Sequence, residues 1–125
     1  MGKSVRVLCL ISISIAIPEI AIAQSTTAFD GTYAGVSNTG GGFCSPFMTV
    51  PRPLTIRNGV AQFQGGFQSQ PNLNFEGDVS PQGDLRMKDQ RSHIATGHID
   101  QTGKATASVF NMDPNCTLVA VWQKQ

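Results

Sequence analysis

Apolar and polar residues alternate over short stretches along most of this chain, which is the spacing of β-strands. In LNFEGDV (73–79), the odd-numbered residues are apolar or glycine and the even-numbered residues are polar, and successive side chains of a strand point to opposite faces. After the first residues, no window has the three- and four-residue spacing of an amphipathic helix. The pattern predicts eight strands, over residues 30–37, 53–57, 60–64, 73–79, 84–89, 93–100, 104–111 and 116–124.

The dipeptide Asn58-Gly59 lies between two of these stretches and fixes how they pair. A two-residue type I′ hairpin turn needs positive φ at both central residues, which asparagine and glycine tolerate. Such a turn places the apolar residues of both strands on one face. The predicted pairs are Arg57 with Val60, Ile56 with Ala61 and Leu54 with Phe63.

The stretch FEGDVSPQGDLRM (75–87) has a counterpart twenty positions later in ATGHIDQTGKATA (95–107). Gly77 and Gly83 recur as Gly97 and Gly103, while the aspartates of the first copy become histidine and lysine in the second. The recurring property is backbone geometry, so the aspartates indicate a turn and not a carboxylate site. Two hairpins of one design are predicted, with these residues facing inward: Leu85, Met87, Ala95, Ile99, Ala105, Ala107 and Val109.

A run of hairpins without a crossover helix is an antiparallel meander, whose two outer edges must be covered or joined. Joining them gives a small up-and-down barrel of about eight strands, and an even number of strands lets the first and last pair antiparallel. Gly35, Gly77 and Gly97, inside strands, are expected to be bends or bulges. An open β-sandwich of the same meander is the alternative.

Two segments do not have a strand pattern. Residues 37–52 form a long loop with three consecutive glycines, and residues 65–72 form a shorter polar one. Long connections in a compact domain are often functional, which makes Phe43, Phe47 and Phe67 candidates for ligand binding. The alternative is that these rings plug the barrel ends, since inward glycines and alanines leave volume to fill.

The first 23 residues have the three zones of a secretory signal peptide. Lys3 and Arg6 precede the apolar run VLCLISISIAI (7–17), Pro18 ends the run, and small residues precede Gln24. We expect a periplasmic or secreted protein whose residues 24–125 form a single β-barrel domain. A short membrane anchor is the alternative.

Without that segment, seven of the nine basic residues and seven of the eight acidic residues remain. A neutral surface argues against nucleic acid or an anionic membrane as the partner, and we expect no membrane insertion. Cys44 and Cys116 are expected to form a disulfide in an oxidising compartment, which would stabilise the fold by roughly 4 kcal/mol. Two free buried thiols are the alternative.

Ionisable residues that could carry chemistry are few. His93 and His98 lie five residues apart on one predicted strand, so they point to opposite faces and cannot share a metal ion. His93 has the inward parity and is expected at the barrel mouth. Glu76 and Asp78 share a face, but it is the outward one, and glycosidase chemistry needs two carboxyls in one cleft.

No catalytic motif, metal site or cofactor site is recognisable, so we expect a monomeric binding module and not an enzyme. Trp122 ends the most hydrophobic strand and is expected in the core, or alternatively as a wall for ligand stacking. The partner is expected to be a protein, as for small barrel inhibitors, or a small apolar ligand. The alternatives are an envelope protein with a structural or stress role, and a hydrolase using Glu76, Asp78 and His93. The predicted ligand-binding residues are Phe43, Phe47, Phe67, His93 and Trp122.

Three motifs of the chain resemble those of a group of small exported bacterial proteins of unknown function. The motifs are FDGTYAGVS (29–37), the turns PQGD (81–84) and QTGK (101–104), and the closing CTLVAVWQKQ (116–125). The resemblance implies export, a β-rich fold and a bacterial source, and it implies no activity.

Overall fold

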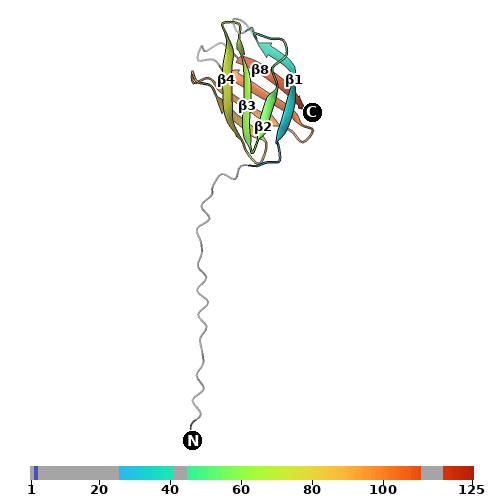
Figure 1. The fold of residues 1–125 in the computed structure, drawn as a ribbon, viewed down its shortest axis with the longest axis vertical. Helices are drawn as coiled ribbons and strands as arrows, with labels where there is room; N and C mark the ends of the chain where they lie inside the picture. The colour runs from blue at the N-terminus through green and yellow to red at the C-terminus, as the bar shows by residue number, and fades with distance from the viewer. Residues whose placement is uncertain (1, 3–25, 41–44, 111–116) are drawn as a thin grey trace.

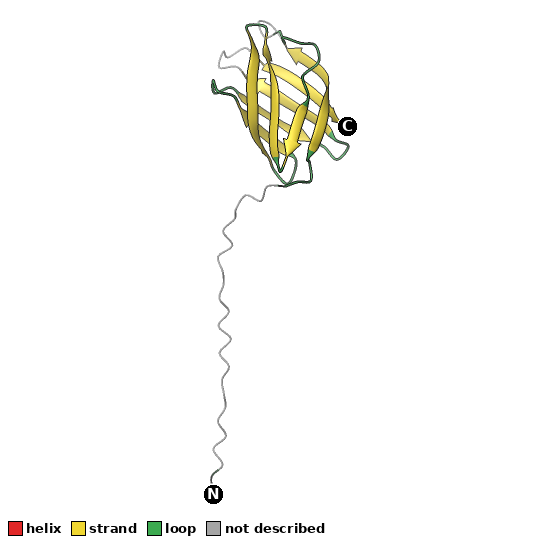
Figure 2. Cartoon of the chain, viewed as in Figure 1, coloured by secondary structure: helices red, strands yellow, loops and turns green. Residues whose placement is uncertain are grey.

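The computed structural model describes residue 2 and residues 26–40, 45–110 and 117–125. These residues contain eight strands and no helix (Figure 2). The strands are β1 (Gly31–Gly40), β2 (Leu54–Arg57), β3 (Val60–Phe67), β4 (Gln70–Val79), β5 (Asp84–Lys88), β6 (Ile94–Ile99), β7 (Lys104–Phe110) and β8 (Thr117–Lys124).

Each strand pairs antiparallel with the next, and β8 pairs with β1, so the sheet is a closed up-and-down barrel (Figure 1). The prediction of a barrel is confirmed, and the open sandwich is excluded. In the closing pair, Tyr33 lies opposite Lys124 at one end and Gly40 lies opposite Leu118 at the other. We call the lower end in Figure 1, where β1 begins, the turn end, and the end where β1 finishes the loop end.

The hairpin of β2 and β3 has the predicted register. Asn58 and Gly59 have φ values of 53° and 76°, and Ile56 lies opposite Ala61 as Arg57 lies opposite Val60. The two turn residues therefore determine which side chains of both strands face the core.

The two repeated hairpins also have the same turn. In the first, Ser80 N donates to Asp84 O at 2.9 Å and Gly83 N donates to Ser80 O at 2.9 Å. In the second, Asp100 N donates to Lys104 O at 3.0 Å and Gly103 N donates to Asp100 O at 3.1 Å. Gly83 and Gly103 have φ values of 91° and 82°, which glycine adopts without strain.

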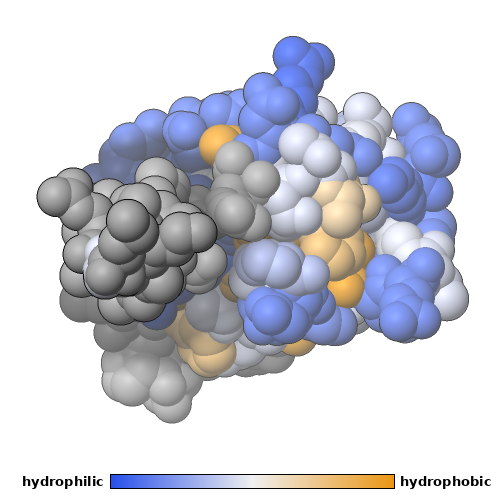
Figure 3. Space-filling model, turned by 90° about the horizontal axis from the view of Figure 1, so that it is seen from below, coloured by the Kyte–Doolittle hydropathy of each residue, from blue (hydrophilic) through white to orange (hydrophobic). Residues whose placement is uncertain are grey.

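The turn glycines join neighbouring hairpins at the turn end. The carbonyl oxygens of Gly59, Gly83 and Gly103 accept hydrogen bonds of 2.8–3.0 Å from the amide N–H groups of the neighbouring strand ends, which are Val79, Ile99 and Lys124. Figure 3 views this end, and its described surface is mainly hydrophilic around small hydrophobic areas.

Two aspartates hold these turns closed. The Asp30 carboxylate accepts from Asn58 N at 2.8 Å and Gly59 N at 3.1 Å. Asp100 accepts from the Thr102 hydroxyl and from the amides of Thr102 and Lys104. The Thr102 hydroxyl bond, followed by the Lys104 amide bond, lowers the pKa of Asp100 below its ordinary value of 3.8. Asp100 is therefore ionised, and a full acceptor, at neutral pH.

Aromatic side chains fill much of the barrel interior. Phe63 and Phe75 stack with their centroids 4.8 Å apart, and Phe63 meets Trp122 edge-on at 5.0 Å. Trp122 is fully buried, and its Nε1 donates to the Arg52 carbonyl at 2.8 Å.

Tyr33 closes the turn end, because its hydroxyl donates to Phe29 O at 2.6 Å. Burial of the Tyr33 side chain, with a smaller contribution from Asp30, raises its pKa above the ordinary value of 10.0. Large rings on β1, β3, β4 and β8 thus occupy the space that the alanines of β6 and β7 leave.

The three strand glycines have different roles. Gly35 lies at a register shift between β1 and β8, which confirms a bulge there. Gly77 and Gly97 are in unbroken register with their neighbours, so they are not bulges. A Cβ at Gly77 would lie 1.8 Å from Arg86 O, and one at Gly97 would lie 2.1 Å from Thr106 O. At these points the backbone of the neighbouring strand lies so close that only glycine fits.

Gly77→Ala is expected to destabilise the barrel by about 3 kcal/mol, because the added methyl group meets a backbone carbonyl that cannot rotate away. Gly65→Ala is the matched control, since its Cβ would meet the edge of the Phe63 ring at 3.1 Å and a ring can shift. This control is expected to lose about 1 kcal/mol or less. Denaturant unfolding measures both, and equal losses would contradict the close-approach explanation.

Three strand boundaries differ from the sequence prediction by three residues each. The segment 65–72, predicted as a polar loop, is the tip of a hairpin in which β3 continues to Phe67 and β4 begins at Gln70. Similarly, β1 continues to Gly40, three residues beyond its predicted end. Neighbouring strands give these polar, glycine-rich residues their backbone hydrogen bonds. A local sequence pattern cannot predict such pairing, because the partner strand is elsewhere in the chain.

Other predictions fall on residues outside the described part of the chain. They are the cleavage before Gln24, the cysteines Cys44 and Cys116, and the candidate Phe43. Among the described residues, there is no helix with the length and hydrophobicity needed to cross a lipid bilayer.

Candidate functional site

The structure brings three of the predicted ligand-binding residues to the loop end and places a fourth in the core. Phe47 lies in the segment 45–53, Phe67 ends β3, and His93 precedes β6. Phe67 is 1% exposed and lies 6.4 Å from the His93 ring, whereas Phe47 is 50% exposed. Trp122 is in the core, with no exposed surface. Phe67 is therefore buried at the barrel end, as the plug alternative predicted, whereas Phe47 is not.

His93 forms a buried pair with Asp89, a residue that the sequence did not single out. His93 Nδ1 and Asp89 Oδ2 are 2.5 Å apart, and the side chains are 4% and 0% exposed. Asp89 Oδ1 also accepts from the amides of Arg91 and His93. The pair is buried, and its hydrogen bonds fix the turn between β5 and β6 at the loop end. The four-residue spacing in DQRSH (89–93) is the only sequence signal for it.

Of the other ionisable candidates, Glu76 lines the larger groove described below, and Asp78 and His98 do not. Glu76 and Asp78 point outward from β4, opposite Lys88 and Arg86 of β5. His98 Nδ1 lies 3.2 Å from Asp84 Oδ1 on the exposed wall, with side-chain exposures of 56% and 69%. Within the described ranges, no group of three or more His, Cys, Asp or Glu side chains is arranged to hold a metal ion.

The segment 45–53 completes the barrel wall at the loop end between β1 and β3. Phe47 N donates to Gly66 O at 3.2 Å, and Gln68 N donates to Ser45 O at 3.1 Å. On the other side, Asn38 donates from its backbone N to Thr49 O at 2.8 Å and from Nδ2 to Met48 O at 3.1 Å. Hydrogen bonds on both sides therefore join the segment to β1 and to the β3–β4 hairpin.

This fixed segment presents apolar side chains to solvent. Phe47, Met48 and Val50 are 50%, 41% and 43% exposed. Phe47 and Met48 line a small hollow together with Gly65 and Gly66 of β3 and Pro71 of β4.

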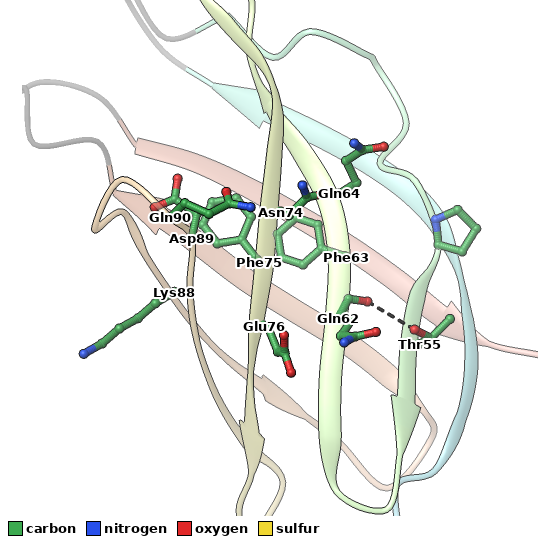
Figure 4. A pocket seen from close by; sticks show the side chains of 11 residues that line it. Thr55, Gln62, Phe63, Gln64, Asn74, Phe75, Glu76, Lys88, Asp89 and Gln90 are labelled. Atoms are coloured by element: carbon green, nitrogen blue, oxygen red, sulfur yellow. Dashed lines mark hydrogen bonds between the residues drawn. The ribbon is translucent and has the colours of Figure 1, made fainter.

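Two wider grooves adjoin this apolar area on the outer wall. One, of about 540 Å³, crosses β2 to β5 and includes Gln62, Gln64, Asn74 and Glu76 (Figure 4). The other, of about 310 Å³, follows β4 from Ser69 to Asn74, and the two share Asn74 and Gln90. Figure 4 shows Asn74 and Gln90 at the same level of the groove.

We call the continuous surface formed by the small hollow and the two grooves the groove face. Its characteristic residues are Phe47, Met48, Gln64, Pro71, Asn74 and Gln90. Of these, the sequence indicated only Phe47, because the others are brought together by strand pairing and have no motif of their own.

Comparison of the chain with protein-family models, with curated proteins and with solved structures found no match.

Proposed function

We propose that this chain is an exported, non-enzymatic β-barrel that binds a partner protein through the groove face. The observation that carries the proposal is the pair of exposed side chains Phe47 and Met48 on a backbone that is hydrogen-bonded on both sides. A preorganised apolar anchor loses little conformational entropy on binding, and such residues dominate the energy of protein interfaces.

The composition of the surrounding surface supports a protein partner. Carboxamide side chains of Gln62, Gln64, Asn74 and Gln90 line the larger groove next to the apolar anchor. An apolar centre with a polar rim is the usual anatomy of a protein interface. A small apolar ligand inside the barrel is less consistent with the buried rings of Phe75 and Trp122, which both pack against Phe63.

Export and the disulfide form part of the same proposal. The charged, apolar and small-residue zones of residues 1–23 support export. The pairing of Gly40 with Leu118 brings the end of β1 and the start of β8 together, and Cys44 and Cys116 lie four and two residues along the chain from these positions. A disulfide between them would join the two strands that close the barrel.

Site-specific photocrosslinking in the cell that produces the protein tests the proposal. With p-benzoylphenylalanine in place of Phe47, we expect a discrete adduct with a second protein on illumination. Phe110 is the matched control, because it is 49% exposed and lies on β7, across the barrel from the groove face. Phe47→Ser is expected to weaken binding of the captured protein by roughly tenfold or more. Absence of an adduct at position 47, or equal labelling at position 110, would contradict the proposal.

A further inference from the structure

β4 is twice as long as its neighbour β5 and is paired on that side over only part of its length. β4 has 10 residues and β5 has 5, and their pairs run from Glu76↔Lys88 to Val79↔Leu85. The remaining part of β4, from Gln70 to Phe75, pairs with β3 on its other side. Within the described ranges, no strand pairs with this part of β4 on the β5 side.

The hydrogen-bond pattern shows which backbone groups face the gap. Val79 N donates toward β3, to Gly59 O, while Ser80 N donates toward β5, to Asp84 O. Backbone groups of successive strand residues point to opposite sides, and the β3–β4 register is unbroken from Leu73 to Asp78. The N–H and C=O of Asn74 therefore face the side where β5 has ended.

The buried pair of Asp89 and His93 explains why β5 ends there. Asp89 N donates to His93 O at 3.2 Å, and the Asp89 carboxylate binds the amides of Arg91 and His93. The chain consequently turns back at Asp89 instead of continuing along β4. Gln90 and Arg91, on the turn, form the far wall of the 310 Å³ groove, with Asn74 on the near wall.

We propose that an extended segment of the partner protein adds to this open edge as a strand, in the place that β5 leaves beyond Lys88. The proposal rests on the proposed function and names the binding mode at the groove face. An extended peptide is the ligand whose N–H and C=O groups match an open strand edge. The regular β3–β4 register ends at Leu73, so the added strand is limited to a few residues beside Asn74.

The carboxamides of the groove also suit the hydroxyl groups of a glycan, but the aromatic residues do not. Phe63 and Phe75 line the groove with exposures of 6% and 2%, which leaves no ring face on which a sugar can stack. The open backbone edge therefore favours a peptide.

Two substitutions at Asn74 separate backbone pairing from side-chain recognition. Asn74→Pro removes the N–H that faces the gap and leaves the hydrogen bonds of β4 to β3 intact, whereas Asn74→Ala keeps the N–H and removes the carboxamide. Each is combined with p-benzoylphenylalanine at position 90 and, separately, at position 47. We expect adducts of the same mass at both positions in the parent and in Asn74→Ala, and at least a tenfold lower yield at both in Asn74→Pro.

The outcomes distinguish this inference from the function on which it rests. Adducts at position 47 that persist in Asn74→Pro would overturn strand addition and leave the proposed function standing. If Asn74→Ala lost as much of the adducts as Asn74→Pro, binding would depend on the Asn74 side chain, as expected for a glycan. That result would also overturn strand addition. An adduct of twice the mass of the chain would assign the edge to a second copy and not to a partner. No adduct at position 47 in the parent would overturn both proposals.

A second measurement applies if Asn74→Pro does not fold, as judged by circular dichroism. Amide hydrogen exchange at Asn74 is compared by NMR in the unmodified barrel with and without the captured protein. We expect exchange at least tenfold slower in the complex, and unchanged exchange would overturn strand addition.

Discussion

Trp122→Ala is expected to lower the free energy of unfolding by about 3–5 kcal/mol, a large part of the total for a domain of this size. The indole is fully buried and contacts Phe63 edge-on, so its removal leaves a cavity in the middle of the barrel. The Arg52 carbonyl, which accepts from Trp122 Nε1 at 2.8 Å, also loses its donor. Thermal unfolding is expected to shift downward by roughly 20 °C.

Trp122→Phe separates the two contributions to this loss. Phenylalanine retains part of the ring volume and loses the N–H, so we expect a loss of about 1–3 kcal/mol from the unpaired carbonyl together with a smaller cavity. Both variants are measured by denaturant and thermal unfolding. If Trp122→Ala unfolded at the temperature of the unmodified protein, Trp122 would not be a core residue.

Cys116→Ala, or reduction of the unmodified protein, is expected to destabilise the barrel by about 4 kcal/mol. The expected disulfide joins residues that are 72 positions apart, 116 minus 44, and closing so long a loop restricts the unfolded chain strongly. It would also join β1 to β8, the pair that closes the barrel. The melting temperature is expected to fall by roughly 20 °C in either case.

The double variant Cys44→Ala/Cys116→Ala is the control for this prediction. Its melting temperature should equal that of Cys116→Ala and should not respond to a reducing agent. Alkylation followed by mass spectrometry, before and after reduction, counts the free thiols directly. Two alkylated cysteines in the unreduced mature protein would show that the bridge is absent.

Local pattern predicted much of the fold because alternation and turn chemistry are local properties. Asn58 and Gly59 fixed the register of β2 and β3, and the repeat around Gly83 and Gly103 predicted two turns with the same hydrogen bonds. Barrel closure followed from the number of strands and from the need to cover the edges of a meander.

The candidate site was predicted less completely, because its residues meet only through strand pairing. Parity placed His93 inward at the barrel mouth, as observed, but no local pattern showed that Asp89 would be its partner. Phe47 and Phe67 had the same status in the sequence, and only the structure shows that one is exposed and the other buried. The sequence did not predict the hairpin tip at 68–69, because the residues around it are polar or glycine. Pairing between β3 and β4 holds these residues in an extended conformation.

The sequence by itself determined the inward and outward faces of the strands and the turns, since each depends on residues close together in the chain. The barrel was predicted from these hairpins, because an even number of strands can close and cover both edges. The tertiary structure alone decided where the barrel wall is incomplete. That depends on β5 being shorter than β4 and on the buried pair of Asp89 and His93 that turns the chain away. The open edge beside Asn74 is therefore a property of neighbouring strands, and no single stretch of sequence encodes it.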